Sequence, residues 1–281
     1  MSNNEPPDPY DGQREPVIVV RECFKSFGDL TVMKGINLTV YEGETMVVMG
    51  GSGCGKSTLL RHMIGSLKPD SGTITLFGRD ITELDEDELN EVRKQFGILF
   101  QSGALYNSMS VKDNVALPIR EHGSLDEATV EIMVTVKLQM VGMLPWAEAM
   151  PATLSGGQKK RVGLARAIAL DPKVIFYDEP SAGLDPVTST GIDMLMMDLS
   201  GKLGVTSIVV THEMDSAFRI ADRMCMLDRG NAVMIGTCDE FKTTDDPLVK
   251  QFTTGSEQGP IPLVPGDEEY AEKILGEHGQ R

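Results

Sequence analysis

The sequence predicts an α/β protein built on a mostly parallel sheet with helices on its faces. Short apolar runs alternate with stretches whose apolar residues recur at helical spacing, and this alternation is typical of strand–helix–strand units. A mainly helical block at about 103–170 interrupts the alternation and predicts an inserted helical subdomain. The 281 residues are enough for one large domain with such an insert.

Local patterns predict each element in turn. Apolar and β-branched runs predict strands at 17–24, 36–51, 72–78, 96–101, 173–180 and 205–213, and a hairpin at 223–236 that turns at Gly230–Asn231. Helical spacing predicts helices at 57–67, within 103–170 and at about 190–204. We expect a disordered tail at 1–15, one main domain at 16–253 and a C-terminal extension at 254–281.

Composition excludes some classes of function. The formal net charge of −16 argues against nucleic acid as a partner, because phosphate backbones are bound by an excess of Lys and Arg. The four cysteines show no metal-binding spacing and are typical of reduced thiols in the cytosol. No apolar run approaches the ~20 residues of a membrane span, and the first residues do not resemble a signal peptide. We therefore expect any membrane role to be carried out from the aqueous side, through a partner.

A phosphate-binding loop is the strongest motif. The segment "GGSGCGKST" follows a predicted strand and precedes a predicted helix, which is the context that this motif requires. Its backbone N–H groups can surround phosphates, Lys56 can reach the terminal phosphates, and the Ser57 hydroxyl can bind Mg²⁺. The predicted nucleotide-binding residues here are Gly50, Gly51, Ser52, Gly53, Cys54, Gly55, Lys56, Ser57 and Thr58.

Cys54 lies within this loop, near a helix N-terminus and beside Lys56. Both neighbours favour a thiolate, so alkylation of Cys54 is expected to inhibit the protein and bound ATP to protect it. The alternative interpretation is an inert small residue.

Polar residues follow three further predicted strands. Asp178 and Glu179 end "KVIFYDEP", where Asp178 can hold Mg²⁺ and Glu179 can orient or deprotonate the attacking water. Gln101 follows "FGILF" and His212 follows "TSIVVT". Parallel strands bring their carboxyl ends to one edge of a sheet, so these side chains are predicted to meet near the γ-phosphate.

A second helix start also suits an anion. "LSGGQ" places a Ser cap and two glycines, Ser155, Gly156 and Gly157, before a helix. The phosphates at Lys56 are already surrounded by their own loop and sheet. We therefore predict that this second helix start covers the γ-phosphate of a nucleotide held by another copy. Two chains paired head to tail would enclose two ATP molecules.

The order of these motifs resembles the ATP-binding subunits of ABC transporters over roughly residues 17–245. The resemblance implies a P-loop NTPase (RecA-like) core with an antiparallel β part and the helical insert, and ATP and Mg²⁺ as cofactors. It also implies that Gln158 belongs to the nucleotide-binding signature and that Gln101 binds the metal and links nucleotide state to the membrane partner. By the same pattern, Asp185 communicates across the dimer, His212 contacts the γ-phosphate, and Phe27 stacks on adenine unless it is a core residue.

Two further stretches indicate which branch of the ABC transporter family the chain resembles. "LFQSGALYNSMSVKDNVALPIREH" and the "VKQFTTGSEQGPIP" region resemble ATPases of Mla/Mce-type lipid transport systems. The resemblance implies a membrane permease, a lipid-binding Mce protein, a small accessory subunit, and a place on the cytoplasmic face of the inner membrane. Three alternatives stay open: an ABC ATPase for another solute, a soluble ABC protein, and a non-catalytic nucleotide-binding regulator. We expect the extension beyond 254 to pack on the partner copy.

Overall fold

The computed structural model describes residues 9–123 and 125–262, so parts of the predicted tail and C-terminal extension lie outside the described residues. The chain divides into two compact units, Met1–Cys238 and Asp239–Arg281. The second unit holds α9 (Pro247–Thr254) and nearly all of α8 (Cys238–Thr243), and Asp246 caps α9 by accepting from the N–H of Leu248 at 2.8 Å. The predicted boundary at 253 stays a prediction.

A six-stranded sheet forms the centre of the first unit. Its strands are β3 (Thr45–Gly50), β6 (Phe96–Leu99), β7 (Val174–Asp178), β8 (Thr206–Val210), β9 (Arg223–Asp228) and β10 (Asn231–Thr237), in the order β10-β9-β3-β8-β7-β6. All neighbours pair in parallel except β10, which pairs antiparallel with β9. The register places Asp178 beside Val210 and Val210 beside Val48, so the parallel strands end together at one edge.

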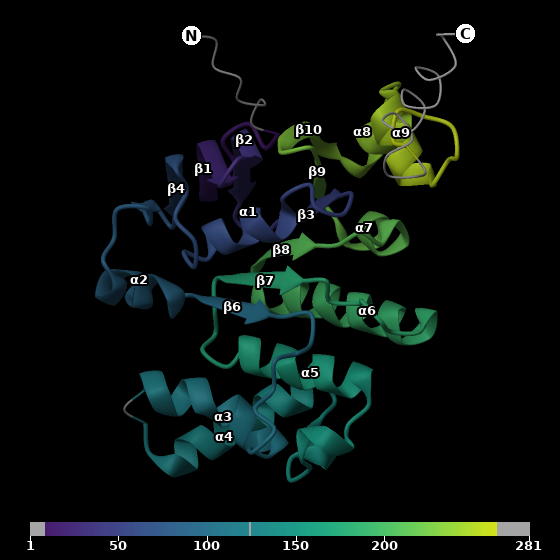
Figure 1. Cartoon of the computed structure of the whole chain (residues 1–281). Helices are drawn as coiled ribbons and strands as arrows, with labels where there is room; N and C mark the ends of the chain where they lie inside the picture. The colour runs from purple at the N-terminus through teal and green to yellow at the C-terminus, as the bar shows by residue number, and fades with distance from the viewer. Residues whose placement is uncertain (1–8, 124, 263–281) are drawn as a thin grey trace, which may run out of the picture. The chain divides into compact units, whose positions relative to one another are not determined.

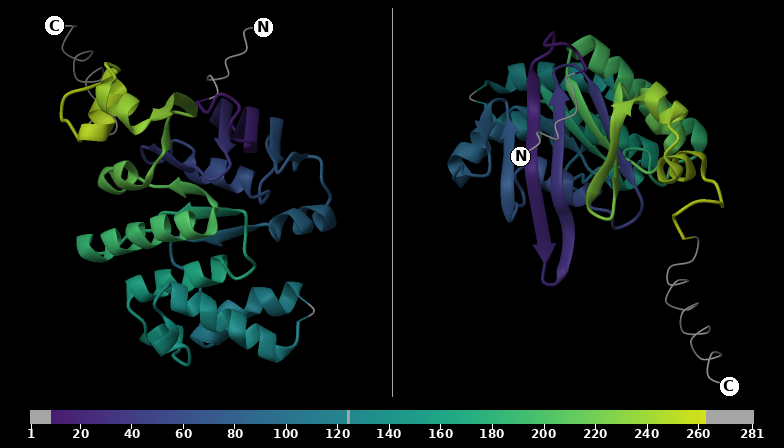
Figure 2. Two further views of the ribbon diagram at one scale, coloured as in Figure 1. Left: turned by 180° about the vertical axis from the view of Figure 1, so that it is seen from behind. Right: turned by 90° about the horizontal axis from the view of Figure 1, so that it is seen from above.

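A second, antiparallel sheet is formed by β1 (Pro16–Phe27), β2 (Leu30–Tyr41), β4 (Ser71–Leu76) and β5 (Arg79–Asp80), in the order β2-β1-β4-β5. The apolar residues of both sheets and of α1 (Lys56–Met63) form one buried cluster. Seen from the front and from behind, α1 and α6 (Pro186–Leu203) lie on opposite faces of the six-stranded sheet (Figures 1 and 2). The α/β fold class is therefore confirmed.

The helical insert is also present. It contains α3 (Val111–His122), α4 (Glu127–Met140), two short 3₁₀ turns (Leu144–Trp146 and Pro151–Thr153) and α5 (Gly156–Ala167), which lie together beyond β6 (Figure 1). Gly97 of β6 touches α5, because a Cβ added there would lie 2.1 Å from the carbonyl oxygen of Ala167. This contact leaves no room for a side chain and places α5 against the sheet.

One sequence expectation about the elements was wrong, and a helix in an acidic stretch was not predicted. The predicted strand at 36–51 is two strands, β2 and β3, in different sheets, because Gly43 turns the chain with a φ of 71°. The acidic stretch near 86–91 is α2 (Glu86–Arg93), which begins with a capping box between Asp85 and Glu88. The remaining helix of the unit is α7 (Met214–Ile220). Within the described residues, no helix combines the length and apolarity needed to cross a membrane.

Candidate active site

The loop between β3 and α1 is held tightly by its glycines and by Lys56. Gly50 has a φ of 146°, and a Cβ added there would lie 2.2 Å from the carbonyl oxygen of Leu227, so a larger residue would displace the loop. The Lys56 ammonium donates to the carbonyls of Gly50 at 2.6 Å and Gly51 at 3.0 Å. Gly55 precedes α1 without a side-chain cap, which leaves the first N–H groups of the helix to an anion.

Cys54 does not have the thiolate character that the sequence suggested. Its side chain is buried, and burial raises the pKa of the thiol by more than the nearby Lys56 lowers it. The Lys56 ammonium is 3.9 Å from Sγ and is used by the loop carbonyls. The expectation of a reactive thiolate is therefore wrong in this conformation, and the inert-residue interpretation is the better one.

The carboxyl end of β7 carries the two predicted acids. Asp178 ends the strand half-buried, and burial followed by the neighbouring Glu179 raises the pKa of its carboxyl, against the opposing charges of Lys160 and Arg61. Its oxygen can serve a cation that lies beside the loop. The structure thus places a carboxyl group at the end of β7, and its predicted binding of Mg²⁺ stays a prediction.

Glu179 and His212 are brought together, as the sequence predicted. The Nδ1 of His212 lies 2.9 Å from Oε1 of Glu179, and the Glu179 side chain is mostly buried while that of His212 is exposed. The other carboxylate oxygen, Oε2, is buried and has no hydrogen-bond partner among the described residues. Glu179 itself adopts a φ of 48°, a conformation rare for side chains of this kind.

Gln101 is exposed just beyond the end of β6, at the same sheet edge. The hydrogen bonds of the described residues do not join it to Glu179 or His212. The loop that follows it is held by Arg166 of α5, which donates to the carbonyls of Ala104 at 2.8 Å and Gly103 at 3.0 Å. Gln101 therefore lies on a loop that the helical insert positions, and its predicted role stays a prediction.

The signature residues begin α5 through a capping box. Ser155 Oγ accepts from the N–H of Gln158 at 3.3 Å, and Gln158 Oε1 accepts from the N–H of Ser155 at 2.9 Å. A Cβ added to Gly157 would lie 2.5 Å from Cγ2 of Thr188, so α5 begins directly against α6. Within the described residues, no hydrogen bond joins Ser155–Gln158 to the phosphate loop of the same chain.

Two other predicted residues have clear surroundings. Asp185 caps α6 by accepting from the N–H groups of Val187 at 3.1 Å and Thr188 at 3.0 Å, and contacts with Thr188 lower the pKa of its carboxyl. Phe27 is 50 % exposed at the end of β1, which excludes the core alternative. Stacking on adenine stays a prediction for Phe27, as does communication across the dimer for Asp185.

Sequence reasoning gave no role to two basic residues of α5. Arg166 holds the loop after Gln101, and the buried Lys160 donates to the carbonyl of Glu179 at 2.9 Å. The available signal was helical spacing: Gly157, Lys160 and Leu164 recur on one buried face of the helix. A lysine on such a face needs a partner, and the sequence alone does not reveal which one.

A glycine loop with its lysine after β3, an aspartate that ends β7 in the same sheet, and a glutamate paired with a histidine together define a nucleoside triphosphatase. The family comparison makes the class specific, because residues 33–182 match the family described as ABC transporter. The chain belongs to the ABC transporter family of ATP-binding subunits and is an ATPase of that type.

Curated relatives and solved structures agree with this family. A protein of Mycobacterium leprae named a probable ribonucleotide transport ATP-binding protein, mkl, is 42 % identical over 92 % of this chain and 74 % of its own length. The intermembrane phospholipid transport system ATP-binding protein MlaF of Haemophilus influenzae is 41 % identical over 92 % of this chain and 98 % of its own. A dimeric ATP-binding cassette solved in a post-hydrolysis state with ADP and Pi is 30 % identical, with a TM-score of 0.73, over 79 % of this chain and 98 % of that one.

Proposed function

We propose that this ATPase powers phospholipid transport between or across membranes through a permease partner. The supporting observation is the similarity to MlaF, which extends over 92 % of this chain and 98 % of the relative. The similar identity to mkl supports a second candidate, transport of ribonucleotides. The two candidates share the ATPase chemistry and differ in the cargo of the permease.

The residues at the sheet edge suit hydrolysis of ATP. Lys56 and the loop N–H groups would bind the phosphates, and Glu179, oriented by His212, would deprotonate or align the attacking water. The Ser57 hydroxyl, the Asp178 carboxylate and the Gln101 amide oxygen are hard oxygen donors that fit Mg²⁺. A cation would also offset the cost of the half-buried charge on Asp178. When bound, the metal would neutralise charge on the phosphate oxygens.

The lid of each site would come from a second copy. Ser155 uses an Oγ lone pair to cap α5, so its hydroxyl hydrogen is free to be donated to a phosphate oxygen. The N–H groups at Gly156 and Gly157 add the positive end of the helix. Paired head to tail, two copies would hold two ATP molecules, which agrees with the dimeric cassette among the solved relatives.

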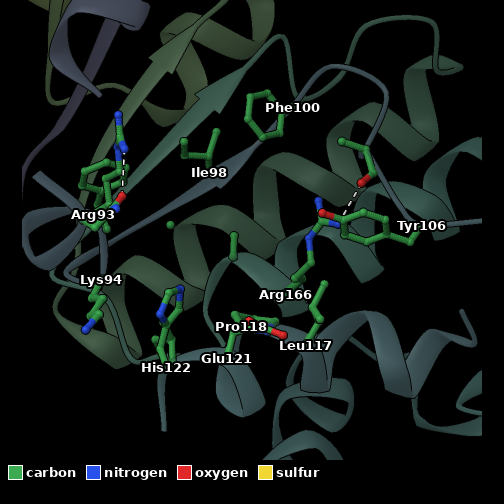
Figure 3. A pocket seen from close by; sticks show the side chains of 16 residues that line it. Arg93, Lys94, Ile98, Phe100, Tyr106, Leu117, Pro118, Glu121, His122 and Arg166 are labelled. Atoms are coloured by element: carbon green, nitrogen blue, oxygen red, sulfur yellow. Dashed lines mark hydrogen bonds between the residues drawn. The ribbon is translucent and has the colours of Figure 1, made fainter. Parts of the chain in front are cut away.

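A groove beside the Gln101 loop is suited to the permease. This cavity of about 470 Å³ lies between β6, α2, α3 and α5, and Figure 3 shows Ile98, Phe100 and Leu117 around it. Its lining includes four basic side chains, Arg93, Lys94, His122 and Arg166, and the acidic Glu121. Arg93 and Lys94 pair with Glu86 and Glu91, so Arg166 and His122 are the basic groups open to an acidic side chain of a partner. An amphipathic helix of the permease with an acidic side chain would fit here. Because Phe100 precedes Gln101, such contact would act directly on the loop of the active site.

This scheme places the protein on the cytoplasmic face of the inner membrane, with the permease and, by analogy with Mla/Mce systems, a lipid-binding Mce protein and a small accessory subunit. The test is purification with the native permease and reconstitution into phospholipid vesicles. We expect ATP-dependent movement of a labelled phospholipid that stops with Glu179→Gln. ATP-dependent accumulation of a labelled ribonucleotide, without lipid movement, would replace the lipid assignment by the second candidate.

A further inference from the structure

Lys160 is a buried cation that the hydrolysis scheme above does not use. Its side chain is 4 % exposed, and its ammonium donates to the main-chain carbonyl of Glu179 at 2.9 Å. Among residues 9–123 and 125–262 it forms no ion pair with a carboxylate. Burial of an ammonium without such a partner is unfavourable. Burial lowers the pKa of Lys160, and the nearby charges of Asp178 and Glu179 oppose that effect.

The carbonyl that Lys160 contacts belongs to a strained residue. Glu179 has a φ of 48°, and residues keep such conformations only where their surroundings hold them. Its N–H donates to the carbonyl of Val210 at 2.9 Å. Its own carbonyl accepts from Lys160 at 2.9 Å and from the N–H of Ala182 at 3.3 Å. Without Lys160, only the longer of these two bonds would hold the carbonyl.

The Glu179 side chain depends on this backbone for its position. One carboxylate oxygen contacts His212, whose ring is exposed, and the other has no partner among the described residues. The contact with His212 restrains one carboxylate oxygen, and the position from which the side chain starts is set by the main chain of Glu179. A small rotation of the Glu179 peptide would move the base relative to the attacking water.

Lys160 also joins two parts of the enzyme. It lies five residues after Ser155 on α5, and at a rise of about 1.5 Å per residue the two are about 7.5 Å apart along the helix. Under the proposed function, the start of α5 touches the ATP of the partner copy. The same helix, which lies beside β6 in Figure 1, holds Glu179 of its own chain through Lys160.

We propose that Lys160 is a positioning residue for ATP hydrolysis. It holds the backbone of Glu179 in place and connects this residue to α5, whose start would contact the ATP held by the partner copy. This inference rests on the proposed function, because it takes Glu179 as the base and α5 as the lid. It predicts that removing the contact slows the chemical step and leaves the binding of ATP unchanged.

The test compares three variants of the full-length chain. Lys160→Met removes the donor at similar volume, and Lys160→Gln keeps an N–H donor without the charge. Lys137→Met is the matched control, because Lys137 is another buried lysine of the helical insert and pairs with Asp171 outside the site. We expect Lys160→Met to lower kcat by about 10- to 100-fold, the cost of a slightly misplaced group, with KM and ATP-dependent pairing unchanged. Lys160→Gln should restore part of the rate, and Lys137→Met should keep the kcat of the wild type.

A wild-type kcat in Lys160→Met would overturn the inference. So would an equal loss in both Lys160 variants accompanied by a raised KM and weaker pairing, because that pattern indicates a general packing role. If Lys160→Met does not fold, Lys160→Gln is compared with the wild type instead. A lowered kcat with unchanged KM and pairing supports the inference, and a wild-type kcat overturns it. The proposed function is judged separately: it fails if Glu179→Gln retains turnover or if the wild-type chain does not pair with ATP.

Discussion

The two helix starts that we propose to face phosphate, at α1 and at α5, are built differently. Before α1, Gly55 supplies no side-chain cap, and the Lys56 ammonium sits within the loop on the carbonyls of Gly50 and Gly51. Before α5, Ser155 and Gln158 cap each other, and no basic side chain lies in the first turn except Lys159. The start of α1, with its loop and lysine, can bind a polyphosphate without help from another chain. The start of α5 can add only a few hydrogen bonds to a phosphate that another loop already holds.

This difference predicts an order of events. ATP should bind first to the loop at α1 and only then attract the α5 end of a second copy. The variants below separate the chemistry, the loop, the lid and the stability of α1, from the largest expected effect to the smallest.

Glu179→Gln tests the chemistry while both helix ends stay intact. Loss of the base should lower turnover by ~10²–10⁴, with ATP-dependent pairing retained. Single-turnover hydrolysis and size-exclusion chromatography with ATP measure the two properties. Unchanged hydrolysis would show that another group serves as the base.

Lys56→Met tests the end at α1. The loop would lose its cation, so ATP affinity should fall by roughly 10²–10³, and pairing should be lost with it. Calorimetric titration with ATP measures this effect. Lys68→Met, an exposed lysine away from the loop, is the control, and equal losses in both variants would contradict the assignment.

Ser155→Ala tests the end at α5. ATP should still bind to single chains, but pairing should weaken by roughly 10- to 100-fold, the value of one hydrogen bond to a charged group. The variant also loses a helix cap, so Asp126→Ala is the matched control: Asp126 caps α4 by accepting from the N–H of Thr129 at 3.0 Å. Equal weakening in both would mean that cap stability, and not a phosphate contact, explains the result.

His62, a buried histidine of α1, makes the folding stability depend on pH, whereas α5 contains no histidine. Its ring is 1 % exposed, with Nδ1 2.6 Å from the carbonyl of Leu67 and Nε2 unpartnered among the described residues. Burial lowers the pKa of this histidine in the folded chain, so the unfolded chain binds more protons. The stability that depends on His62 is complete above the unfolded pKa of about 6.5 and is lost as the pH falls below it.

Urea unfolding at pH 7.5 and 5.5 measures this smallest effect. The wild type should lose more stability between the two pH values than His62→Gln does, and the exposed His122→Gln should behave like the wild type. An identical loss in wild type and His62→Gln would remove the explanation.

The sequence predicted most of the fold because strands and helices differ in apolar spacing over many residues. It failed where one turn decides the outcome: Gly43 separates β2 from β3 and sends them to different sheets. The strand order of the central sheet also lies beyond local patterns, because it depends on crossovers between distant segments.

The candidate site was predictable where a motif fixes backbone geometry, as at Lys56 and Ser155. Lys160 was missed because its partner is a main-chain carbonyl, and any residue type could supply one. Cys54 was misjudged because the sequence shows its charged neighbour but not its burial, and burial dominates the pKa.

The contact of Gly157 with Thr188 has a genetic consequence. A side chain at 157 would push α5 away from α6, while the phosphate loop of the same chain would remain intact. In the proposed head-to-tail dimer, such a chain would bind ATP normally at its own phosphate loop. Its displaced α5 would, however, no longer cover the ATP held by the other copy. An allele of this kind would therefore be dominant negative, because mixed dimers of one mutant and one wild-type chain would also lose activity.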